Sequence, residues 1–229
     1  MKILVIGGQH GDERLGGSVV KTLQSHSLAG VEAILANEKA FAQNIRFIDQ
    51  DLNRSFPGDP NGNYEQRRAH ELMPFITSAD IVLDIHTTTS DIRMVPIVAN
   101  TNSSIRKVLH YSSARDIVVM GDAAIRHSLI GHARTGISLE FGGQYAATKS
   151  ALRDVTEIIE GLLERPEQPK KMRRIFHVAG KISLETDLPK DARNFAYIDS
   201  LKMYPFLLHE KSYKDFQGFY ADSYEEIEI

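Results

Sequence analysis

The residues of this chain that are best suited to metal chemistry lie in two short polar segments. His10 and Glu13 are three residues apart, and no other histidine in the sequence is followed by glutamate at that spacing. Imidazole nitrogens and carboxylate oxygens bind zinc, and a catalytic zinc site uses three protein ligands and keeps one position open. His86 is our candidate for the third ligand, because it ends the apolar run 81–85 and precedes the polar residues 87–90. We predict a metal site where these three side chains converge.

The segment that begins at Asp51 contains an acid, an amide and a guanidinium within four positions. One interpretation is an Asx-type turn whose charges face solvent. The other is functional: Asp51 orients a metal-bound imidazole, while Asn53 and Arg54 bind a carboxylate, which planar arginine can do through two parallel hydrogen bonds. The local sequence favours neither interpretation.

Glu140 is a single carboxylate near the end of the apolar segment 136–141. Glutamate is rarely buried in a strand without a partner or a catalytic task. Glu140 is therefore a candidate for acid or base chemistry.

Short apolar runs alternate with segments of helical periodicity, which is typical of a mixed or parallel α/β sheet. The run 3–6 predicts a strand buried on both faces, and apolar residues recur at helical spacing over 13–25. The polar turn 7–12 therefore lies between the end of a strand and a helix, which is where open α/β sheets bind ligands. Further strands are expected at 31–36, 81–85, 94–99, 117–120 and 136–141, and helices near 64–77, 103–113 and 145–164.

A change of pattern divides the chain near residue 166. The prolines in 165–169 end the last expected helix, and the remainder is more polar and strand-like. We expect a zinc-binding catalytic α/β domain over 1–165 and a small β-rich domain over 166–229. The basic run 170–174 is interpreted as a solvated face rather than a phosphate site.

Composition restricts the chemistry further. The 229 residues are 42% hydrophobic and 25% charged, which is typical of a globular protein, and the formal net charge of −3 gives no general electrostatic reason to bind nucleic acid or an anionic membrane. Without cysteine, thiolate zinc sites, disulfides and cysteine nucleophiles are excluded, so a metal must bind His, Asp or Glu. The sequence shows no signal-peptide core and no apolar run of about 18 residues, so we expect a cytoplasmic protein.

Four segments occur in a fixed order along the chain. They read G-G-x-H-G-D-E, D-L-N-R-S-F, D-I-H-T-T-T-S and I-S-L-E-F-G-G-Q. Together they resemble the aspartoacylase and succinylglutamate desuccinylase family, which is related to the zinc carboxypeptidases. The resemblance covers residues 1–150, and a fainter match to the family's C-terminal motif spans 204–216. It implies a carboxypeptidase-like mixed α/β sheet with helices on both faces, followed by a small β-rich domain.

For the metal, the resemblance implies one zinc ion per chain, held by His10, Glu13 and His86. Glu140 resembles the general base that takes a proton from the zinc-activated water and later gives it to the leaving amine. Asp51 resembles the residue that orients the first zinc histidine.

For the substrate, Arg46 resembles the arginine that polarises the scissile carbonyl. Asn53 and Arg54 resemble the pair that binds the α-carboxylate, and Tyr213 resembles a tyrosine contributed by the C-terminal domain. The family's further arginine, which binds a side-chain carboxylate, has no counterpart at matching spacing. Two candidates for it remain: Arg126 and Arg134.

The activity implied by this resemblance is hydrolysis of the amide bond of an N-acyl amino acid. The segments T-T-T-S and E-F-G-G-Q are closer to the aspartoacylase branch, so an acetylated acidic amino acid is the expected substrate. Three alternatives remain: a desuccinylase-like enzyme, a carboxypeptidase-like peptide hydrolase, and a metal-binding protein without catalysis. We expect a homodimer as the assembly.

Overall fold

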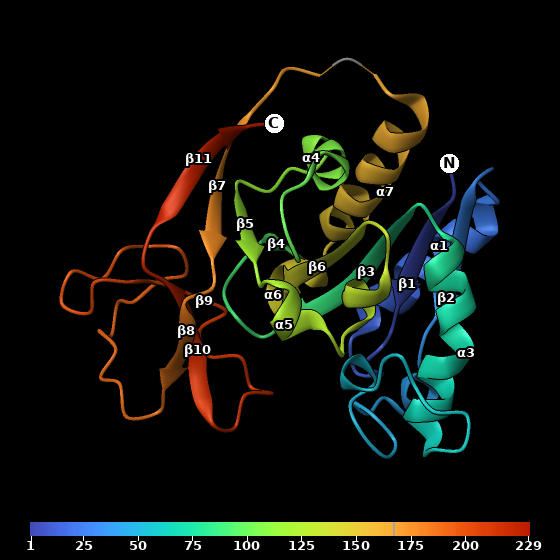
Figure 1. Ribbon diagram of the computed structural model, residues 1–229, viewed down its shortest axis with the longest axis horizontal. Helices are drawn as coiled ribbons and strands as arrows, with labels where there is room; N and C mark the ends of the chain where they lie inside the picture. The colour runs from blue at the N-terminus through green and yellow to red at the C-terminus, as the bar shows by residue number, and fades with distance from the viewer. Residues whose placement is uncertain (167) are drawn as a thin grey trace.

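A large mixed sheet forms the centre of the computed structural model, which describes residues 1–166 and 168–229 and, except at 122 and 123, their side chains (Figure 1). The strands are β1 (Ile3–Gly7), β2 (Val31–Leu35), β3 (Ile81–Thr88), β4 (Met94–Val98), β5 (Asp116–Val119), β6 (Gly136–Gly142), β7 (Met172–His177), β8 (Gly180–Ser183), β9 (Tyr204–Phe206), β10 (Phe216–Ala221) and β11 (Tyr224–Glu228). The helices are α1 (Arg14–His26), α2 (Glu38–Gln43), α3 (Tyr64–Ser78), α4 (Ser103–His110), α5 (Asp122–Ile125), α6 (Gly143–Ala146) and α7 (Lys149–Glu164), with 3₁₀ turns η1 (Leu52–Arg54) and η2 (Leu129–His132).

The large sheet has the strand order β11-β7-β5-β4-β6-β3-β1-β2, and β8-β10-β9 form a separate small sheet. Strands β1, β2, β3 and β6 are parallel to one another, so their carboxyl ends lie along one edge. Strand β4 is antiparallel to β6, β5 and β7 are parallel to β4, and β11 is antiparallel to β7. The expected mixed sheet is therefore confirmed, and its parallel half contains the two strands expected to carry catalytic side chains.

Both faces of the large sheet are covered. On one face, alternate residues of β1 and β3 pack in a common core with apolar residues of α1, α4 and α7. The opposite face is covered in two parts: α3, η1 and η2 pack against β1 and β3, whereas the small sheet and its loops pack against β4, β5 and β7. The carboxyl ends of β3 and β6 lie between these two parts.

The first strand and helix form where the sequence predicts them. Residues 3–6 are fully buried, as expected for a central strand covered on both faces. At the turn that follows, Gly8 has a φ of +67°, a conformation that favours glycine. A Cβ on Gly7 would lie 2.3 Å from the carbonyl oxygen of Gly16, so glycine there lets α1 begin close against the strand end. This close approach places the start of α1 beside the edge of the sheet.

Helix α3 begins at a capping box. The side chain of Asn63 accepts the backbone N–H of Gln66 at 3.0 Å, and the Gln66 side chain accepts the backbone N–H of Asn63 at 2.9 Å. The reciprocal bonds satisfy two of the helix's unpaired N–H groups and fix the orientation of its first turn. Residues Tyr64 and Glu65 of that turn face the loop that leads to η1.

The C-terminal part of the chain contributes to both sheets. Strands β7 and β11 extend the large sheet, while the segment between them forms the small sheet at the lower left of Figure 1. The predicted β-rich character of 166–229 is confirmed, but a boundary at residue 165 does not separate the two sheets. The division into domains stays a prediction, and residue 167 of the expected 165–169 helix stop lies outside the described residues.

The interpretation of 170–174 as a solvated face is wrong for two of its arginines. Arg173 is 3% exposed and donates to the backbone carbonyls of Leu109, Ser112 and Ala114 at the end of α4. Arg174 donates to Asp116 at 2.6 Å across the β5–β7 pair. A charge run cannot reveal this, because alternate residues of a strand face opposite sides of the sheet.

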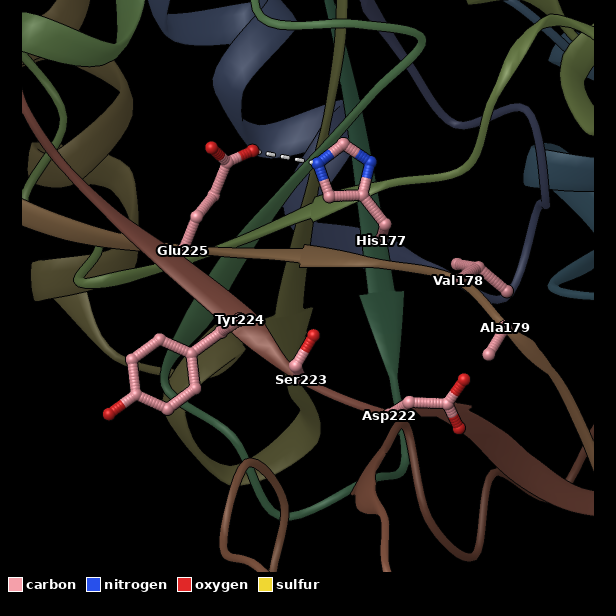
Figure 2. A pocket seen from close by; sticks show the side chains of 7 residues that line it. All are labelled: His177, Val178, Ala179, Asp222, Ser223, Tyr224 and Glu225. Carbon is pink, nitrogen blue, oxygen red and sulfur yellow. Dashed lines mark hydrogen bonds and ion pairs between the residues drawn. The ribbon is translucent and has the colours of Figure 1, made fainter.

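Two connections join the large and small sheets, and they lie next to each other (Figure 2). The chain leaves β7 through Val178 and Ala179 and returns to β11 through Asp222 and Ser223, and these residues line a cavity of about 380 Å³. At the side of this cavity, Nε2 of His177 lies 2.9 Å from a carboxylate oxygen of Glu225, a contact that joins β7 to β11. None of the described helices is both long enough and apolar enough to cross a membrane.

Candidate metal centre and active site

Three side chains that the sequence singled out converge at the carboxyl edge of the parallel strands. His10 lies in the turn after β1, Glu13 directly precedes α1, and His86 lies near the end of β3. Each offers one ligand atom, and these three atoms lie within 4.8 Å of one another. The three residues are 4%, 6% and 2% exposed, so the group is enclosed by protein. Such a group of two imidazoles and one carboxylate could hold a metal ion.

Glu13 is turned toward the cluster and away from its own helix. It occupies the N-cap position of α1, where an acidic side chain commonly accepts a hydrogen bond from the first turn, but no such bond forms. Instead, its Oε1 lies 2.5 Å from Nδ1 of His10 and its Oε2 lies 3.1 Å from Nδ1 of His86. The backbone N–H of Thr87 donates to Oε2 at 2.8 Å and holds the carboxylate in place.

Each histidine has a second carboxylate on its far side. Nε2 of His10 lies 3.0 Å from Asp51, and Nε2 of His86 lies 2.9 Å from Asp84. Each ring therefore lies between two carboxylates, and without a metal both of its nitrogens can donate a proton. If a metal took the place of the protons on the two Nδ1 atoms, each Nε2–H would still donate to its outer carboxylate, as metal-bound histidines commonly do.

The carboxylates also set the protonation of the cluster without metal. Burial lowers the pKa of His86, but Asp84 and Glu13 outweigh burial and raise that pKa well above its ordinary value. Burial raises the pKa of Glu13, but His86 and His10 outweigh it, so this pKa lies well below its usual range. The enclosed carboxylates therefore favour a positive charge beside them. Protons on the rings supply that charge in the metal-free protein, and a divalent cation could supply it in their place.

Glu140 lies beside His86 in the sheet. The two residues are register neighbours in the parallel pair β3–β6, so their side chains leave the same face. Burial raises the pKa of Glu140 to about 7, with the negative charge of Glu13 adding to the effect and His86 opposing it. No described protein group hydrogen-bonds its carboxylate, so it is free to exchange a proton with a reactant near neutral pH.

The loop between α2 and η1 brings a guanidinium to the cluster. Arg46 lies 3.6 Å from Glu13 and 3.5 Å from Asp51, and about a third of its side chain is exposed. The backbone carbonyl of Arg46 also accepts the N–H of Gly11 at 3.1 Å, which ties this loop to the turn that carries His10. Arg46 therefore reaches the cluster while one side of it remains open to solvent.

Asp51 precedes the short 3₁₀ turn that contains Asn53 and Arg54, and its contacts fit both an Asx-type turn and the expected bond to a histidine. Asp51 caps the turn by accepting the Asn53 N–H at 2.9 Å, as an Asx-type turn does, and the same oxygen accepts from His10. The side-chain oxygen of Asn53 accepts the N–H of Leu129 at 3.2 Å, which leaves its amide NH₂ available. Arg54 is exposed and donates to the carbonyl of Asn53 at 3.0 Å.

Tyr213 is brought to the site by the C-terminal segment. Burial raises the pKa of its phenol, Glu140 and Glu210 add to this, and the positive charges of Arg54 and Arg46 oppose it. Its ring stacks on Phe216 with centroids 4.2 Å apart. Glu210 accepts the N–H of Thr89 and the hydroxyl of Thr88, both at 2.5 Å, and so fastens this segment to the end of β3.

The structure separates the two candidates for the additional arginine. Arg134 is wrong for this role, because it precedes β6 and pairs with Asp80 before β3, at the edge of the sheet opposite the metal ligands. Arg126 lies in the segment that packs against η1, where the N–H of Phe56 donates to the carbonyl of His127. Arg126 remains a candidate because it is exposed and because Leu129 of the same segment donates its N–H to the side chain of Asn53.

Three contributors to the site were missed in the sequence. Asp84 had a signal, since it lies two residues before His86 and alternate strand residues share a face. Glu210 lies three residues before Tyr213, within the C-terminal motif, but nothing local marks it as a contact of β3. Gln9, fully buried, donates to Asp84 at 2.7 Å, and no pattern predicts this bond.

Comparison with known proteins agrees with this geometry. The N-acyl-aromatic-L-amino acid amidohydrolase (carboxylate-forming) of Xenopus tropicalis is 35% identical over 108 residues, which are 39% of this chain and 34% of that protein. A probable aspartoacylase of Nostoc sp. is 30% identical over 129 residues, which are 49% of this chain and 44% of that protein. The matches thus span less than half the length of these relatives.

Solved structures share the fold over the whole chain. Murine aminoacylase 3 has a TM-score of 0.76 at 21% identity, covering 100% of this chain and 96% of that one. The succinylglutamate desuccinylase of Chromobacterium violaceum has a TM-score of 0.75 at 17% identity, covering 100% and 85%. The model of the succinylglutamate desuccinylase/aspartoacylase catalytic domain matches residues 1–165, the stretch that contains every candidate metal ligand and Glu140. The chain belongs to the succinylglutamate desuccinylase/aspartoacylase catalytic domain family.

Proposed function

We propose that this protein is a zinc-dependent amidohydrolase that removes the acyl group from an N-acyl amino acid. The observation that carries the proposal is the enclosed group His10, Glu13 and His86, with the unpaired carboxylate of Glu140 next to it on the same sheet face. Two histidines and one glutamate are a known ligand set of catalytic zinc in amide hydrolases. The names of the relatives, which are amidohydrolases and aspartoacylases, agree with this chemistry.

Zinc bound to these three residues would supply Lewis acidity for the acyl carbonyl and for water. Glu140 accepts one proton of the attacking water, whose oxygen forms a bond to the acyl carbon. The same carboxyl group then gives that proton to the amine nitrogen as the carbon–nitrogen bond breaks. The second proton of the water passes from the new carboxylic acid to the amine, so a carboxylate and an amino acid with a charged ammonium group leave. Burial of Glu140, which raises its pKa in the metal-free protein, favours a carboxyl group that can hold the proton between the two transfers.

Arg46 donates to the carbonyl oxygen as negative charge develops there. Its position between Glu13 and Asp51 supports this role, since it already lies within 3.6 Å of a candidate metal ligand. Removal of one such donor typically costs about 3–4 kcal/mol of transition-state stabilisation.

Asn53 and Arg54 bind the α-carboxylate of the substrate. The free NH₂ of Asn53 and the exposed guanidinium of Arg54 support this assignment. Tyr213 closes the site from the C-terminal side, and its proximity to both arginine charges and to Glu140 is the support for that role. An acetylated acidic amino acid remains the proposed substrate, with Arg126 as the candidate for its side-chain carboxylate.

A panel of substrates tests the proposal. The zinc-loaded protein is assayed against N-acetyl-aspartate, N-succinyl-glutamate, N-acetyl-phenylalanine and C-terminal dipeptides, with Glu140→Gln as the blank for contaminating activity. We expect turnover of an N-acyl amino acid. Activity on dipeptides alone would favour a carboxypeptidase-like hydrolase, which could use the same metal group and carboxylate-binding pair. Bound zinc without turnover of any substrate would indicate a non-catalytic metal-binding protein.

The metal itself is tested by stoichiometry. We expect one zinc per chain by elemental analysis, and we expect His86→Ala to lower that occupancy because it removes one of three protein ligands. Full activity of protein that contains no transition metal would overturn the proposal.

A further inference from the structure

A carboxylate that takes no part in the proposed reaction is completely buried next to the active-site loop. Glu65, in the first turn of α3, is 0% exposed. Its Oε1 accepts the backbone N–H of Ile48 at 2.7 Å, and its Oε2 accepts those of Asp49 at 3.0 Å and Gln50 at 3.3 Å. Three consecutive amides of one loop therefore point at a single side chain.

Glu65 has no cationic partner among the described residues, since none of the ion pairs there includes it. Its charge is met by backbone dipoles, namely the three loop amides and the N-terminal end of its own helix. A fourth donor is the side-chain NH₂ of Asn37, at 3.0 Å from Oε1. Hydrogen bonds to an ionised carboxylate are about twice as strong as neutral ones. The loop is thus bound to α3 by a concentrated set of strong bonds.

The anchored amides lie between the two residues of the loop that contact the metal cluster. Arg46, which lies two residues before Ile48, reaches Glu13 and Asp51 through its guanidinium. Asp51, directly after Gln50, accepts from Nε2 of His10. A shift of the loop backbone would therefore move both contacts together.

Asn37 extends the anchor to the other side of the cluster. Its backbone N–H donates to the carbonyl of Gly8 at 3.0 Å, two residues before His10. Its side-chain oxygen accepts the N–H of Ala40 and caps α2, which leads into the loop. Glu65 thus fixes the loop relative to the turn after β1 as well as to α3.

We propose that Glu65 is a positioning residue that holds the guanidinium of Arg46 and the carboxylate of Asp51 in register with the metal cluster. The kinetic part of this inference rests on the proposed amide hydrolysis, whereas the structural part does not. Glu65 acts through the loop backbone and touches neither substrate nor metal.

The charge and length of the side chain both matter for this role. In Glu65→Gln, an NH₂ group replaces one acceptor oxygen and faces backbone N–H groups, so at least one loop amide loses its acceptor. Glu65→Asp keeps the charge but shortens the side chain by one methylene group. Glu71→Gln is the matched control, because Glu71 lies on the same helix with an exposed side chain and pairs with Arg68 at 3.1 Å.

The first experiment measures the loop directly, in zinc-loaded protein, by amide hydrogen exchange of 46–51 with mass spectrometry. We expect exchange in this segment to accelerate about tenfold or more in Glu65→Gln, with a smaller acceleration in Glu65→Asp and none in Glu71→Gln. Zinc stoichiometry at saturating zinc should stay at one in all three variants. Unchanged exchange of 46–51 in Glu65→Gln would overturn the proposal without any assay of activity.

The second experiment measures the coupling to Arg46. We expect Glu65→Gln to lower kcat/KM about 100-fold, with most of the loss in kcat, because misplacement of a group that acts in the transition state costs about that much. In an Arg46→Ala background the same change should cost clearly less, about tenfold or less, because one of the two positioned groups is already absent and only Asp51 remains to be displaced. Equal losses in both backgrounds would show a general structural role and would contradict the proposal.

Together, the two measurements distinguish failure of this inference from failure of the proposed function. Altered exchange in a protein that hydrolyses none of the substrates would support the loop anchor and refute the amidohydrolase. An active enzyme whose Glu65→Gln variant matches the wild type in hydrogen exchange and in kcat/KM would support the amidohydrolase and refute the loop anchor. If Glu65→Gln fails to fold, Glu65→Asp supplies the same comparison.

Discussion

The metal cluster and the loop from Arg46 to Arg54 border the same active site but are held there by different means. His86 and Glu140 belong to adjacent strands, so the backbone ladder of β3 and β6 sets the spacing between them. The loop has only a 3₁₀ turn as regular structure, and its position depends on side-chain bonds such as those of Glu65 and Asp51. One half of the site is therefore fixed by the sheet, and the other half by single side chains.

This difference separates two kinds of effect. A change at the cluster should alter metal binding or the chemical step, because the surrounding strands keep the fold in place. A change in the loop should alter how the substrate and the transition state are held, while metal binding is retained except at Asp51, which contacts His10. Each prediction below tests one side of that separation, in order of decreasing expected effect.

Glu140→Gln should have the largest effect on activity. The amide keeps the shape of the side chain but cannot accept the proton of water, so we expect kcat to fall by about 10³–10⁴-fold. Zinc content by elemental analysis and the circular dichroism spectrum should match the wild type. If Glu140→Gln lost as much zinc as His86→Ala, Glu140 would be a ligand and the comparison would fail.

Asp84→Asn and Asp51→Asn should weaken zinc binding by about 10–100-fold, because each carboxylate orients one imidazole and increases its basicity. The effect should be larger for Asp84, whose side chain is 1% exposed, than for Asp51, whose side chain is 23% exposed. Competition with a chromophoric chelator measures both affinities. Wild-type affinity in both variants would show that the cluster does not depend on these partners.

Arg54→Lys should lower kcat/KM about tenfold, with zinc retained, because lysine keeps the charge but loses the planar pair of donors. Substrates amidated at the α-carboxylate should react slowly with the wild type, and Arg54→Ala should discriminate much less between acid and amide. Steady-state kinetics on matched acid and amide substrates provides the measurement. If Arg54→Ala slowed both by the same factor, Arg126 would become the next candidate for the carboxylate.

The smallest effect concerns the stability of the metal-free protein. The pKa of Glu140 rises from about 4.5 to about 7 on folding, so folding favours the protonated form. Its contribution to stability is fully present below pH 4.5 and is lost as the pH rises through 7. A glutamine in its place does not titrate, so Glu140→Gln carries no such loss. Between pH 5 and pH 8, the free energy of unfolding of Glu140→Gln should therefore rise relative to that of the wild type by about 1 kcal/mol, after allowance for partial solvent screening.

Urea denaturation in the presence of a chelator measures this difference at both pH values. Glu71→Gln, which makes the same chemical change at an exposed side chain of α3, is the control for the substitution itself. A pH-independent difference between wild type and Glu140→Gln would contradict the environment that the fold gives this carboxylate.

The strands and helices of the catalytic half were largely predictable from the sequence. The apolar run 3–6 and the helical spacing of apolar residues over 64–77 mark the residues that are buried. Because strands and helices form by burying such a face, the pattern predicts the element. Convergence of His10 and His86 followed from the rule that parallel strands carry ligands at their carboxyl ends. These predictions depend on periodicity, which a single sequence displays.

The remaining parts were not predictable because they depend on contacts between distant residues. The pairing of β11 with β7 completes the large sheet across the whole intervening segment 178–223, and no local pattern specifies it. Burial of Arg173 and the anchoring of a loop by Glu65 likewise arise from partners far apart in the sequence. The residue type alone predicts that arginine and glutamate are exposed. Only the tertiary contacts show which of these charged residues are buried.

The position of the small sheet within the chain bears on how enzymes of this architecture can diversify. The chain leaves the large sheet after β7, forms the small sheet and returns to the large sheet at the neighbouring strand β11. The two connections lie next to each other. A unit inserted between adjacent ends can be lengthened, shortened or exchanged at little cost to the framework that holds it. Because Tyr213 belongs to that unit and the candidate metal ligands do not, the walls of the proposed substrate site can change while the framework of the proposed metal centre is kept.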